Sequence, residues 1–364
     1  TYYKDANNND VNIVFAKKKN WMPLGSAPGL NGTVNAIAFD NNGTLYVGGI
    51  FSGASIGGIS SPNRVAKYSN GVWSEVGGGL SGEVSALAFD SAGTTLYAGG
   101  NFNSPIKYVA KITLPGGTWQ QVGLGLNAKV NSLALDSSDT LYAGGIFQYT
   151  SDLTVSLQRI AMCPKNGAWA PIGVGLSDEV NSVVVNGSGS TIYAGGVFTR
   201  VFGGVAGSIQ RVAKFSSGSW SQVGTGLDSQ VLSLTLDSSE TTLYAGGRFA
   251  NKVAKITLPT GTWSLVGLGL NSDVYSLTID SANTLYAGGD FTNTATGGSA
   301  NSICRVAMCP LNGNWIQLGL GFNSLSVTNT IGIDALDAPY AGGSFTTTFT
   351  GTVTLNRIAK YESS

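Results

Sequence analysis

One heptapeptide recurs seven times along the chain and limits what the chain can fold into. The successive tyrosines of this motif are 51, 45, 51, 51, 42 and 54 residues apart, a mean of 49, and the seven tryptophans fall one to each repeat. Repeats of this length that contain several short strands are typical of the blades of a β-propeller. The copies read LYVGGIF at 45, LYAGGNF at 96, LYAGGIF at 141, IYAGGVF at 192, LYAGGRF at 243, LYAGGDF at 285 and PYAGGSF at 339.

Each repeat contains four strand-like runs bounded by turn residues. Examples are VSALAFD at 84, LYAGG at 96, RVAKY at 64 and the run that begins at Trp73. Glycine accounts for 52 of the 364 residues, which disfavours long helices because each glycine costs about 1 kcal/mol in a helix interior. A small sheet is marginal alone, whereas seven sheets stacked radially bury both faces of each. We therefore predict an all-β fold, a single seven-bladed β-propeller over residues 20–364 with four antiparallel strands per blade.

The residues that recur with the motif are predicted to be structural. A glycine pair lets two backbones approach closely or bend where a side chain would clash. The tryptophans are interpreted as packing between blades rather than as seven platforms for sugars. Aspartates that end the first strand are placed to organise hairpins as Asx-turns; calcium sites are disfavoured because the turns lack alternating acidic ligands. These aspartates are Asp40, Asp90, Asp136, Asp237, Asp280 and Asp334.

LYAGG followed by a strand tryptophan resembles the repeat of kelch-like and galactose-oxidase-type β-propellers, whose blades carry a glycine doublet, a tyrosine and a tryptophan. The resemblance extends from about residue 20 to residue 361 and implies a seven-bladed repeat protein. The tyrosine precedes the glycines here, unlike in kelch repeats, and the ALAFD-turn-LY portion looks partly like an NHL-type blade. WD-type repeats are not supported, since the chain has no histidine and no Trp-Asp pair.

The two ends of the chain together supply one strand more than seven blades need. NWMPLG at 20 reads as a fourth strand that closes the last blade. NIVFAKKKN at 12 and NRIAKYESS at 356 both read as copies of the third strand. Residues 1–19 then form an N-terminal arm whose lysines solubilise an edge. Alternatively, a terminal strand within 11–19 or 356–361 pairs with a neighbouring molecule in a self-assembly.

Charge and cysteine content exclude several classes of protein. Basic and acidic residues number 20 each, so the chain lacks the clustered basic excess expected of a nucleic-acid binder. No apolar run approaches the roughly 20 residues that a membrane helix requires, and we expect no membrane insertion. The three cysteines, Cys163, Cys304 and Cys309, are expected to be free thiols because their repeat positions hold them too far apart for a disulfide.

The connections from each fourth strand to the next first strand are predicted to ring one mouth of the central channel. The residue just before the valine of each first strand would face that mouth. Three acids and one lysine make the ring weakly acidic, so it could hold a cation or a basic peptide, although a solvated rim is the simpler interpretation. The six residues are Thr33, Glu83, Lys129, Glu179, Gln230 and Asp273.

The connections from the second strand to the third vary in length, and long variable loops on a rigid scaffold are where recognition is usually located. They contain aromatic residues outside the repeat pattern, which could stack on sugar faces or anchor a partner protein. Packing within the fold is the alternative role. With the charged residues of the mouth, the candidates for ligand binding are Tyr108, Tyr149, Phe202 and Phe349.

Catalytic chemistry finds little support. Without histidine, Ser-His-Asp and Cys-His arrangements and imidazole metal sites are impossible, so the galactose-oxidase-type resemblance does not extend to copper, and we expect no metal and no cofactor. We predict a non-catalytic binding propeller that recognises a partner protein or a surface glycan through its loop face. The alternatives are a structural subunit of an extracellular or particle-surface assembly and, third, a propeller-type lyase or hydrolase. An extracellular or surface location is favoured over a cytoplasmic one.

Overall fold

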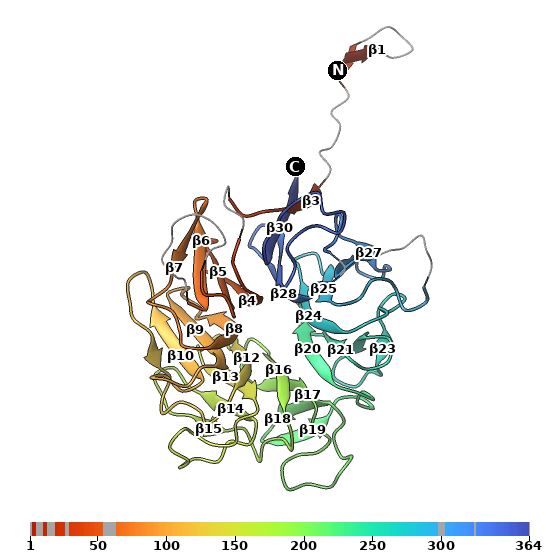
Figure 1. Ribbon diagram of the computed structural model, residues 1–364. Helices are drawn as coiled ribbons and strands as arrows, with labels where there is room; N and C mark the ends of the chain where they lie inside the picture. The colour runs from red at the N-terminus through yellow and green to blue at the C-terminus, as the bar shows by residue number, and fades with distance from the viewer. Residues whose placement is uncertain are drawn as a thin grey trace.

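Small antiparallel sheets account for all regular secondary structure in the part of the chain that the structure describes. The computed structural model describes residues 2–4, 10–12, 19–25, 29–53, 63–297, 303–323 and 325–363 (Figure 1). Near the N-terminus, β1 (Tyr2–Lys4) pairs with β2 (Asp10–Asn12) in a sheet of two strands. The other strands form seven sheets of four strands each, arranged in a ring.

The first six sheets are each built from four consecutive strands, with the first strand near the centre of the ring and the fourth at its rim (Figure 1). Blade 1 contains β4 (Val34–Phe39), β5 (Leu45–Gly49), β6 (Val65–Ser69) and β7 (Val72–Glu75). Blade 2 contains β8 (Glu83–Phe89), β9 (Thr95–Asn101), β10 (Val109–Thr113) and β11 (Gln120–Gln121). Blade 3 contains β12 (Val130–Leu135), β13 (Leu141–Gly145), β14 (Ile160–Cys163) and β15 (Ala170–Pro171).

The next three blades continue the same order. Blade 4 contains β16 (Val180–Val185), β17 (Thr191–Gly196), β18 (Val212–Ser216) and β19 (Ser219–Gln222). Blade 5 contains β20 (Val231–Leu236), β21 (Thr242–Gly247), β22 (Val253–Thr257) and β23 (Ser264–Leu265). Blade 6 contains β24 (Val274–Ile279), β25 (Leu285–Gly289), β26 (Val306–Cys309) and β27 (Ile316–Gln317).

The seventh sheet joins the two ends of the chain. Trp21 pairs with Tyr361 across the outermost pair of strands, and its side chain is fully buried. The prediction that the N-terminal strand closes the last blade is therefore confirmed. The protein is a seven-bladed β-propeller. Blade 7 contains β28 (Thr328–Ile333), β29 (Pro339–Gly343), β30 (Ile358–Ser363) and β3 (Lys19–Met22).

The C-terminal copy of the third strand occupies the place for which two copies competed. β30 pairs with β29 along one edge and with β3 along the other. Its residues therefore offer no open edge to a neighbouring molecule, which corrects the predicted pairing through residues 356–361. The competing copy at 13–17 lies outside the described residues, so a role for residues 11–19 in self-assembly stays a prediction.

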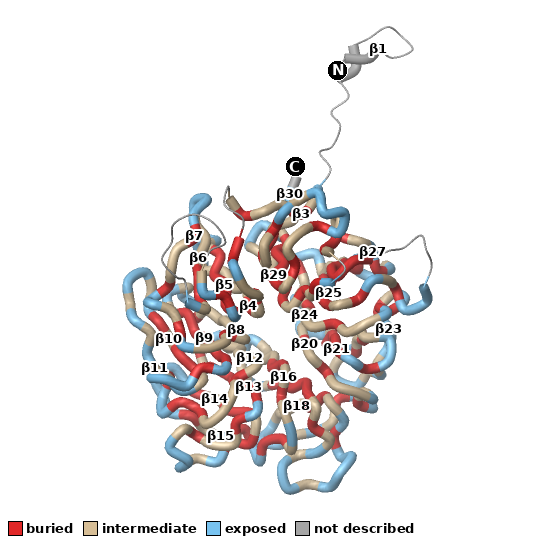
Figure 2. The backbone as a smooth tube through the Cα atoms, in the orientation of Figure 1, coloured by how far each residue is buried: buried red, intermediate tan, exposed pale blue. Residues whose placement is uncertain are grey.

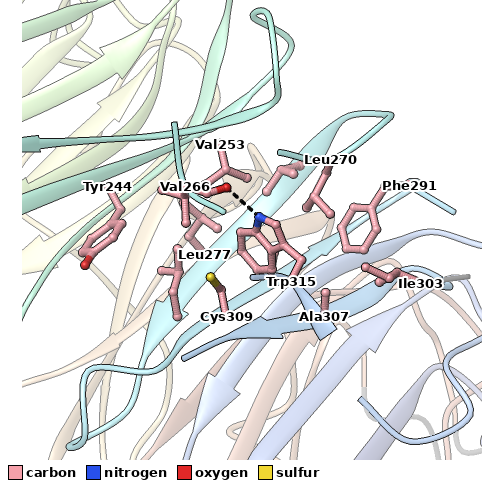
Figure 3. Close-up of a cluster of buried hydrophobic side chains, with 13 residues drawn as sticks. Tyr244, Val253, Val266, Leu270, Leu277, Phe291, Ile303, Ala307, Cys309 and Trp315 are labelled. Carbon is pink, nitrogen blue, oxygen red and sulfur yellow. Dashed lines mark hydrogen bonds between the residues drawn. The ribbon is translucent and has the colours of Figure 1, made fainter. Parts of the chain in front are cut away.

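The hydrophobic core is divided among the seven seams between neighbouring blades. At the seam between blades 5 and 6, Tyr244 of blade 5 belongs to the same cluster as Cys309 and Trp315 of blade 6 (Figure 3). The Trp315 indole Nε1 donates across this seam to the carbonyl oxygen of Val266 at 3.0 Å. Figure 2 shows the buried segments running through every blade and the exposed ones at the connections. The interpretation of the tryptophans as inter-blade packing is thus supported by their contacts.

The glycine doublet accommodates two close approaches in every blade. A Cβ on Gly144 would lie 2.6 Å from Val180 Cγ1 of the next blade. A Cβ on Gly145 would lie 2.2 Å from the carbonyl oxygen of Lys129 in its own blade. The same two encounters, one with the inner strand of the next blade and one with the blade's own inner strand, recur in all seven blades. The repeated motif is therefore explained by packing.

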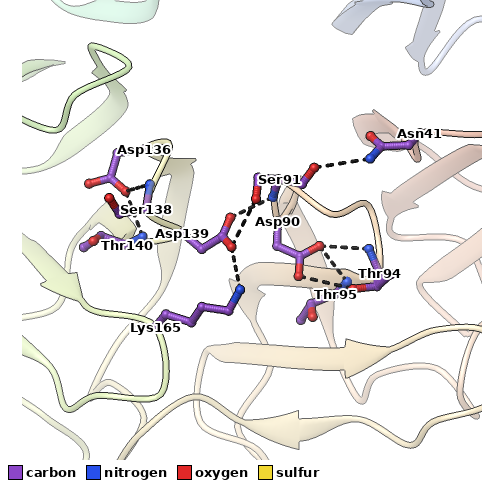
Figure 4. Close-up of polar contacts among 10 residues, drawn as sticks. All are labelled: Asn41, Asp90, Ser91, Thr94, Thr95, Asp136, Ser138, Asp139, Thr140 and Lys165. Carbon is purple, nitrogen blue, oxygen red and sulfur yellow. Dashed lines mark hydrogen bonds and ion pairs between the residues drawn. The ribbon is translucent and has the colours of Figure 1, made fainter.

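The six aspartates predicted to organise hairpins do so. Asp136 Oδ1 accepts hydrogen bonds from the backbone N–H groups of Ser138 and Thr140, both at 2.9 Å (Figure 4). Equivalent bonds hold the other five turns. The Tyr142 hydroxyl donates to Asp136 Oδ2 at 3.0 Å. Burial and this bond raise the pKa of Tyr142 to about 12, so the phenol stays protonated. All three cysteines are free and buried, as expected.

Candidate functional site

Every inner strand contains a β-bulge at its start, beside the central channel. In blade 3, Val130 pairs with Gly145 and Ser132 with Gly144, so Asn131 is the additional residue. The register shifts at the same place in all seven blades, and such a bulge re-aims a side chain. The seven bulge residues line a cavity of about 240 Å³ in the channel. They are Asn35, Ser85, Asn131, Asn181, Leu232, Tyr275 and Asn329.

Amide groups on this ring connect neighbouring blades. Asn131 Nδ2 donates to Glu179 Oε1 at 2.9 Å, and Asn329 Nδ2 donates to Asn35 Oδ1 at 2.7 Å. Asn181 Nδ2 donates to the carbonyl oxygen of the next inner strand at 2.8 Å. The channel wall is therefore polar and already hydrogen-bonded, and it offers a solute mainly amide and hydroxyl oxygen atoms as acceptors. Sequence reasoning missed this ring, although asparagine follows the first residue of the inner strand in four of the seven blades.

We call the face that carries the second-to-third and fourth-to-first connections the loop face, and the opposite face the hairpin face. The six mouth residues predicted from the sequence lie on the loop face, one at the start of the inner strand in each of blades 1 to 6. Glu83 and Lys129 form an ion pair at 3.2 Å. Asp273 accepts from Arg248 Nε at 2.8 Å and lies 3.3 Å from Lys252 Nζ.

Arg248 and Lys252 were not among the candidates, because they lie on the second-to-third connection of blade 5 rather than at a mouth position. Arg248 also donates to the Gln230 side chain at 3.1 Å. These two cations compensate the charge of Asp273 at the mouth. Of the four charged mouth candidates, Glu179 is the one without an ion pair among the described residues, and Thr33 and Gln230 are uncharged.

Tyr275, on the bulge ring below the mouth, is also held in a charged setting. Burial, and then the nearby charge of Asp290, raise the pKa of Tyr275 above its usual value. Its hydroxyl therefore stays protonated at neutral pH.

The four aromatic candidates do not form one site. Tyr108 stands at the start of a third strand with φ of 63°, half-buried against the core between blades 2 and 3. It therefore belongs to the repeat pattern, because other blades place arginine there with a similar positive φ. Each of these arginines donates to the carbonyl oxygen that follows the glycine doublet; they are Arg64, Arg159, Arg211, Arg305 and Arg357. Tyr149 is half-buried, and its backbone N–H donates to Asn127 Oδ1 at 3.1 Å.

Phe202 and Phe349 are displayed on the loop face, 47% and 48% exposed. They occupy the same place in blades 4 and 7, four residues after the phenylalanine of the repeated heptapeptide. The backbone N–H groups of both donate, at 3.1 Å, to the carbonyl oxygen of a glycine in the preceding connection, Gly175 and Gly321 respectively. The loops that carry the two rings are therefore anchored to the scaffold.

Exposed aliphatic residues on the same face were not predicted. Fifteen large hydrophobic side chains are exposed among the described residues. By their place in the strand order, ten of them lie on the loop face, where several follow the glycine of the fourth-to-first connection. These ten are Ile50, Leu124, Ile146, Leu153, Val174, Phe202, Val205, Leu268, Leu325 and Phe349.

Within the described residues, no group of three or more His, Cys, Asp or Glu side chains is placed to hold a metal ion. The same residues contain no helix long and apolar enough to cross a membrane.

Comparisons with known proteins give the fold. No protein-family model matches the chain, and the search of curated proteins found no match. Among solved structures, the WD40 β-propeller domain of Doa1 is similar, with a TM-score of 0.63 and 12% identity over 95% of this chain and 98% of that one. The extracellular domains of two proteins described as hybrid two-component systems of B. thetaiotaomicron have TM-scores of 0.60 and 0.62, with identities of 14% and 13%.

The similarity to these extracellular domains covers 95% of this chain but only 39% and 42% of theirs. This chain thus spans about two fifths of each of those chains. At identities this low, the structural similarity shows a shared propeller architecture and nothing finer. The kelch-like and NHL-like assignments therefore stay predictions.

Proposed function

We propose that the protein is a non-catalytic binding propeller that recognises a partner protein through its loop face. The observation that carries the proposal is the concentration of exposed apolar side chains there, ten of the fifteen among the described residues. Apolar patches with a polar rim are characteristic of surfaces that bind other proteins. On the loop face, the paired charges around the channel mouth supply the polar part.

A protein partner suits this face better than a glycan. The apolar faces of sugars stack on aromatic rings, yet eight of the ten exposed apolar residues on the loop face are aliphatic and only Phe202 and Phe349 are aromatic. Tyr149 and Tyr108, the other two aromatic candidates, are half-buried. Because Phe202 and Phe349 sit on anchored loops, they lose little conformational freedom on binding and are our proposed anchors.

The comparisons inform the proposed location. Two similar structures are extracellular domains, which supports an extracellular or surface-exposed propeller, while similarity to a WD40 domain leaves a cytoplasmic location open. The alternative of a structural subunit gains nothing from the C-terminal strand, since β30 is paired on both edges.

Site-specific photo-crosslinking tests the proposal. A benzophenone amino acid is placed at position 202, at position 349 or, as a control, at Leu336, which is 87% exposed on the hairpin face, and the protein is irradiated in its native setting. We expect the same crosslinked protein from positions 202 and 349 and none from 336. Changing both phenylalanines to serine should then weaken binding of that protein at least tenfold.

Crosslinks that are equal from both faces, or absent from positions 202 and 349, would contradict a partner on the loop face. A glycan array that detects a specific sugar, with no protein crosslink, would replace the protein partner by a glycan. Ordered particles in electron micrographs of the purified chain would favour the structural subunit.

A further inference from the structure

Two crevices on the hairpin face, at the seam between blades 2 and 3 and at the seam between blades 5 and 6, are built from equivalent residues. In each, a tyrosine and a lysine from one blade face a Cys-Pro-x-Asn-Gly turn of the next. The blade 2–3 crevice contains Tyr97, Lys111, Cys163, Asn166 and Gly167. The blade 5–6 crevice contains Tyr244, Lys255, Cys309, Asn312 and Gly313.

We attribute the closure of the blade 2–3 crevice to an ion pair beside it. Lys165 Nζ lies 2.7 Å from Asp139 Oδ2 (Figure 4). Asp139 also accepts hydrogen bonds from the backbone N–H of Ser91 at 2.7 Å and from its hydroxyl at 3.2 Å. The hydrogen bonds from Lys165 and Ser91 lower the pKa of Asp139, so the pair is charged at neutral pH. The space left in this crevice is about 20 Å³.

The blade 5–6 crevice lacks this ion pair and is open. Asn283 and Leu311 stand where the other crevice has Asp139 and Lys165. Asn283 Oδ1 still accepts from Ser238, at 3.3 Å from its nitrogen and 3.2 Å from its hydroxyl, so the contact between blades is kept. Leu311 is 58% exposed. The space that remains is about 300 Å³, the share of about ten water molecules in liquid water.

Two hydrogen-bond donors on the wall of the open crevice have no partner. Lys255 and Tyr244 are paired directly across β22 and β21. Among the described residues, neither the Lys255 ammonium nor the Tyr244 hydroxyl makes a hydrogen bond or ion pair, although Tyr244 is only 5% exposed. By contrast, the equivalent hydroxyl of Tyr286 donates to Asp280 at 3.0 Å.

No carboxylate lies among the residues that line the open crevice. Burial raises the pKa of the Cys309 thiol to about 11, and its Sγ lies 3.3 Å from the carbonyl oxygen of Gly313, so the thiol does not neutralise Lys255. The side chains of Asn312 and Asn314, both exposed, stand at the rim. The crevice therefore combines one unpaired cation, one tyrosine hydroxyl without a hydrogen-bond partner among the described residues, and amide groups.

We propose that the blade 5–6 crevice binds a small anionic ligand, whose carboxylate or phosphate group is held by Lys255 and Tyr244 while Asn312 and Asn314 contact its polar remainder. An ammonium without an ion-pair partner, beside a hydroxyl that can donate, is complementary to such a group. The site lies on the hairpin face and is independent of the loop face, so a failure of one proposal leaves the other in place.

Amide NMR titrations with inorganic phosphate and, separately, acetate test the site. We expect saturable shifts of the Asn312 and Asn314 side-chain amides, with Asn166 of the closed crevice as an internal control that does not move. Lys255→Met should weaken binding at least tenfold, and the matched Lys111→Met should leave it unchanged. The response to phosphate compared with acetate distinguishes the two head groups.

An exchange of the closing residues provides the stricter test. Asn283→Asp with Leu311→Lys should install the ion pair and abolish the shifts at Asn312, whereas Asp139→Asn with Lys165→Leu should open the second crevice and make Asn166 respond. Melting temperatures establish that each variant is folded. The proposal is overturned if neither anion shifts Asn312 and Asn314, or if the shifts survive both Lys255→Met and the installed ion pair.

Discussion

Six of the seven seams are joined at the rim by the same hydrogen bond, and the seam between blade 7 and blade 1 is not. Between blades 2 and 3, Trp169 Nε1 donates to the carbonyl oxygen of Val122 at 3.0 Å. Five other seams have an equivalent bond. At the blade 7–blade 1 seam, Trp73 Nε1 has no hydrogen-bond partner among the described residues, although Leu24 stands at the position of the usual acceptor.

The segment that follows the tryptophan is longer at this seam. Trp21 and Leu30 are nine residues apart, whereas the equivalent Trp169 and Leu176 are seven apart, as in the five other blades. The two additional residues lie between Leu24 and Leu30. In the six regular seams a Cβ on the following glycine would lie 3.2 to 3.3 Å from the tryptophan ring, but one on Gly25 would meet other residues.

Nearer the axis the two kinds of seam are alike. A Cβ on Gly342 would lie 2.5 Å from Val34 Cγ1, much as one on Gly144 would lie 2.6 Å from Val180 Cγ1. The inner strands and the glycine doublet therefore close the ring in the same way at both seams. Among the described residues, the rim hydrogen bond is missing where the segment between the tryptophan and the next buried leucine is two residues longer. The blade 7–blade 1 seam is therefore where we expect the ring to open first.

Deletion of residues 1–22 should have the largest effect on stability. It removes β3 and with it Trp21, whose Nε1 donates to the carbonyl oxygen of Leu318 at the blade 6–blade 7 seam at 2.8 Å. Two adjacent seams would then lack the rim hydrogen bond. Loss of one buried tryptophan costs about 3–5 kcal/mol, so urea denaturation should show at least this loss. Deletion of residues 1–18, which keeps β3, is the control, and equal midpoints for the two deletions would refute the prediction.

Alanine at the first glycine of the doublet tests whether the seams are alike near the axis. Gly144→Ala and Gly342→Ala should each cost about 1–3 kcal/mol, because the added methyl overlaps a valine of the next blade. Equal losses in urea denaturation are expected for the two seams. A clearly smaller loss of unfolding free energy for Gly342→Ala would show that the blade 7–blade 1 seam is also less tightly packed near the axis. Val180→Ala added to Gly144→Ala should recover part of the loss.

Phenylalanine in place of tryptophan isolates the rim hydrogen bond. Trp169→Phe removes the hydrogen bond to Val122 and leaves a buried carbonyl group without this donor. Trp73→Phe replaces the indole by a smaller ring and breaks no hydrogen bond among the described residues. Both tryptophans are 4% exposed, so the two variants lose similar apolar contact. Trp169→Phe should therefore cost about 1 kcal/mol more than Trp73→Phe. If calorimetry finds that the two variants lose the same stability, the rim hydrogen bond does not contribute measurably to it.

The regular part of the fold could be predicted because the same local pattern occurs in every blade. Strand order, the closing strand at 20 and the Asx-turns all follow from residues that repeat. The bulge ring could not be predicted, because the residue pair Val130–Asn131 looks like any two positions of a strand until its register with Gly144 is known. Arg248 also escaped notice, since it reaches Asp273 from another blade.

The open crevice was hidden for a related reason. Its equivalence to the closed one was visible in Cys163 and Cys309, which share a repeat position three blades apart. The two crevices differ at two equivalent positions. Asp139 corresponds to Asn283, and Lys165 corresponds to Leu311. These positions meet only when the hairpin of one strand pair and the turn of another lie side by side. A comparison of blade with blade, rather than of each blade with an average, would have found them.

The ion pair on the hairpin face should give a smaller, pH-dependent effect. The pKa of Asp139 is lowered in the folded state by Lys165 and Ser91, so its contribution is fully present above an unfolded pKa of about 3.9 and is lost as the pH falls through the folded value. Asp139→Asn should lower the melting temperature by about 2 °C at pH 7. The difference from the wild-type protein should shrink as the pH falls below about 3.9. A difference that does not shrink on acidification would contradict the carboxylate as its source.

Gly43→Asp should stabilise the blade 7–blade 1 seam by the smallest amount. Gly43 holds, in blade 1, the turn position that Asp139 holds in blade 3, with φ of 76° against 60°, and a Cβ there would meet nothing within 4 Å. Aspartate tolerates this conformation, and its carboxylate could accept the N–H of Ala335, as Asp139 accepts that of Ser91. We expect a rise of about 1 °C in melting temperature.

Gly93→Asp is the matched control: its Cβ would lie 2.7 Å from Asn41, so it should destabilise. If Gly43→Asp lowers the melting temperature as much as Gly93→Asp does, the turn of blade 7 lies out of reach, and the weak seam differs in blade spacing as well as in the length of its connection.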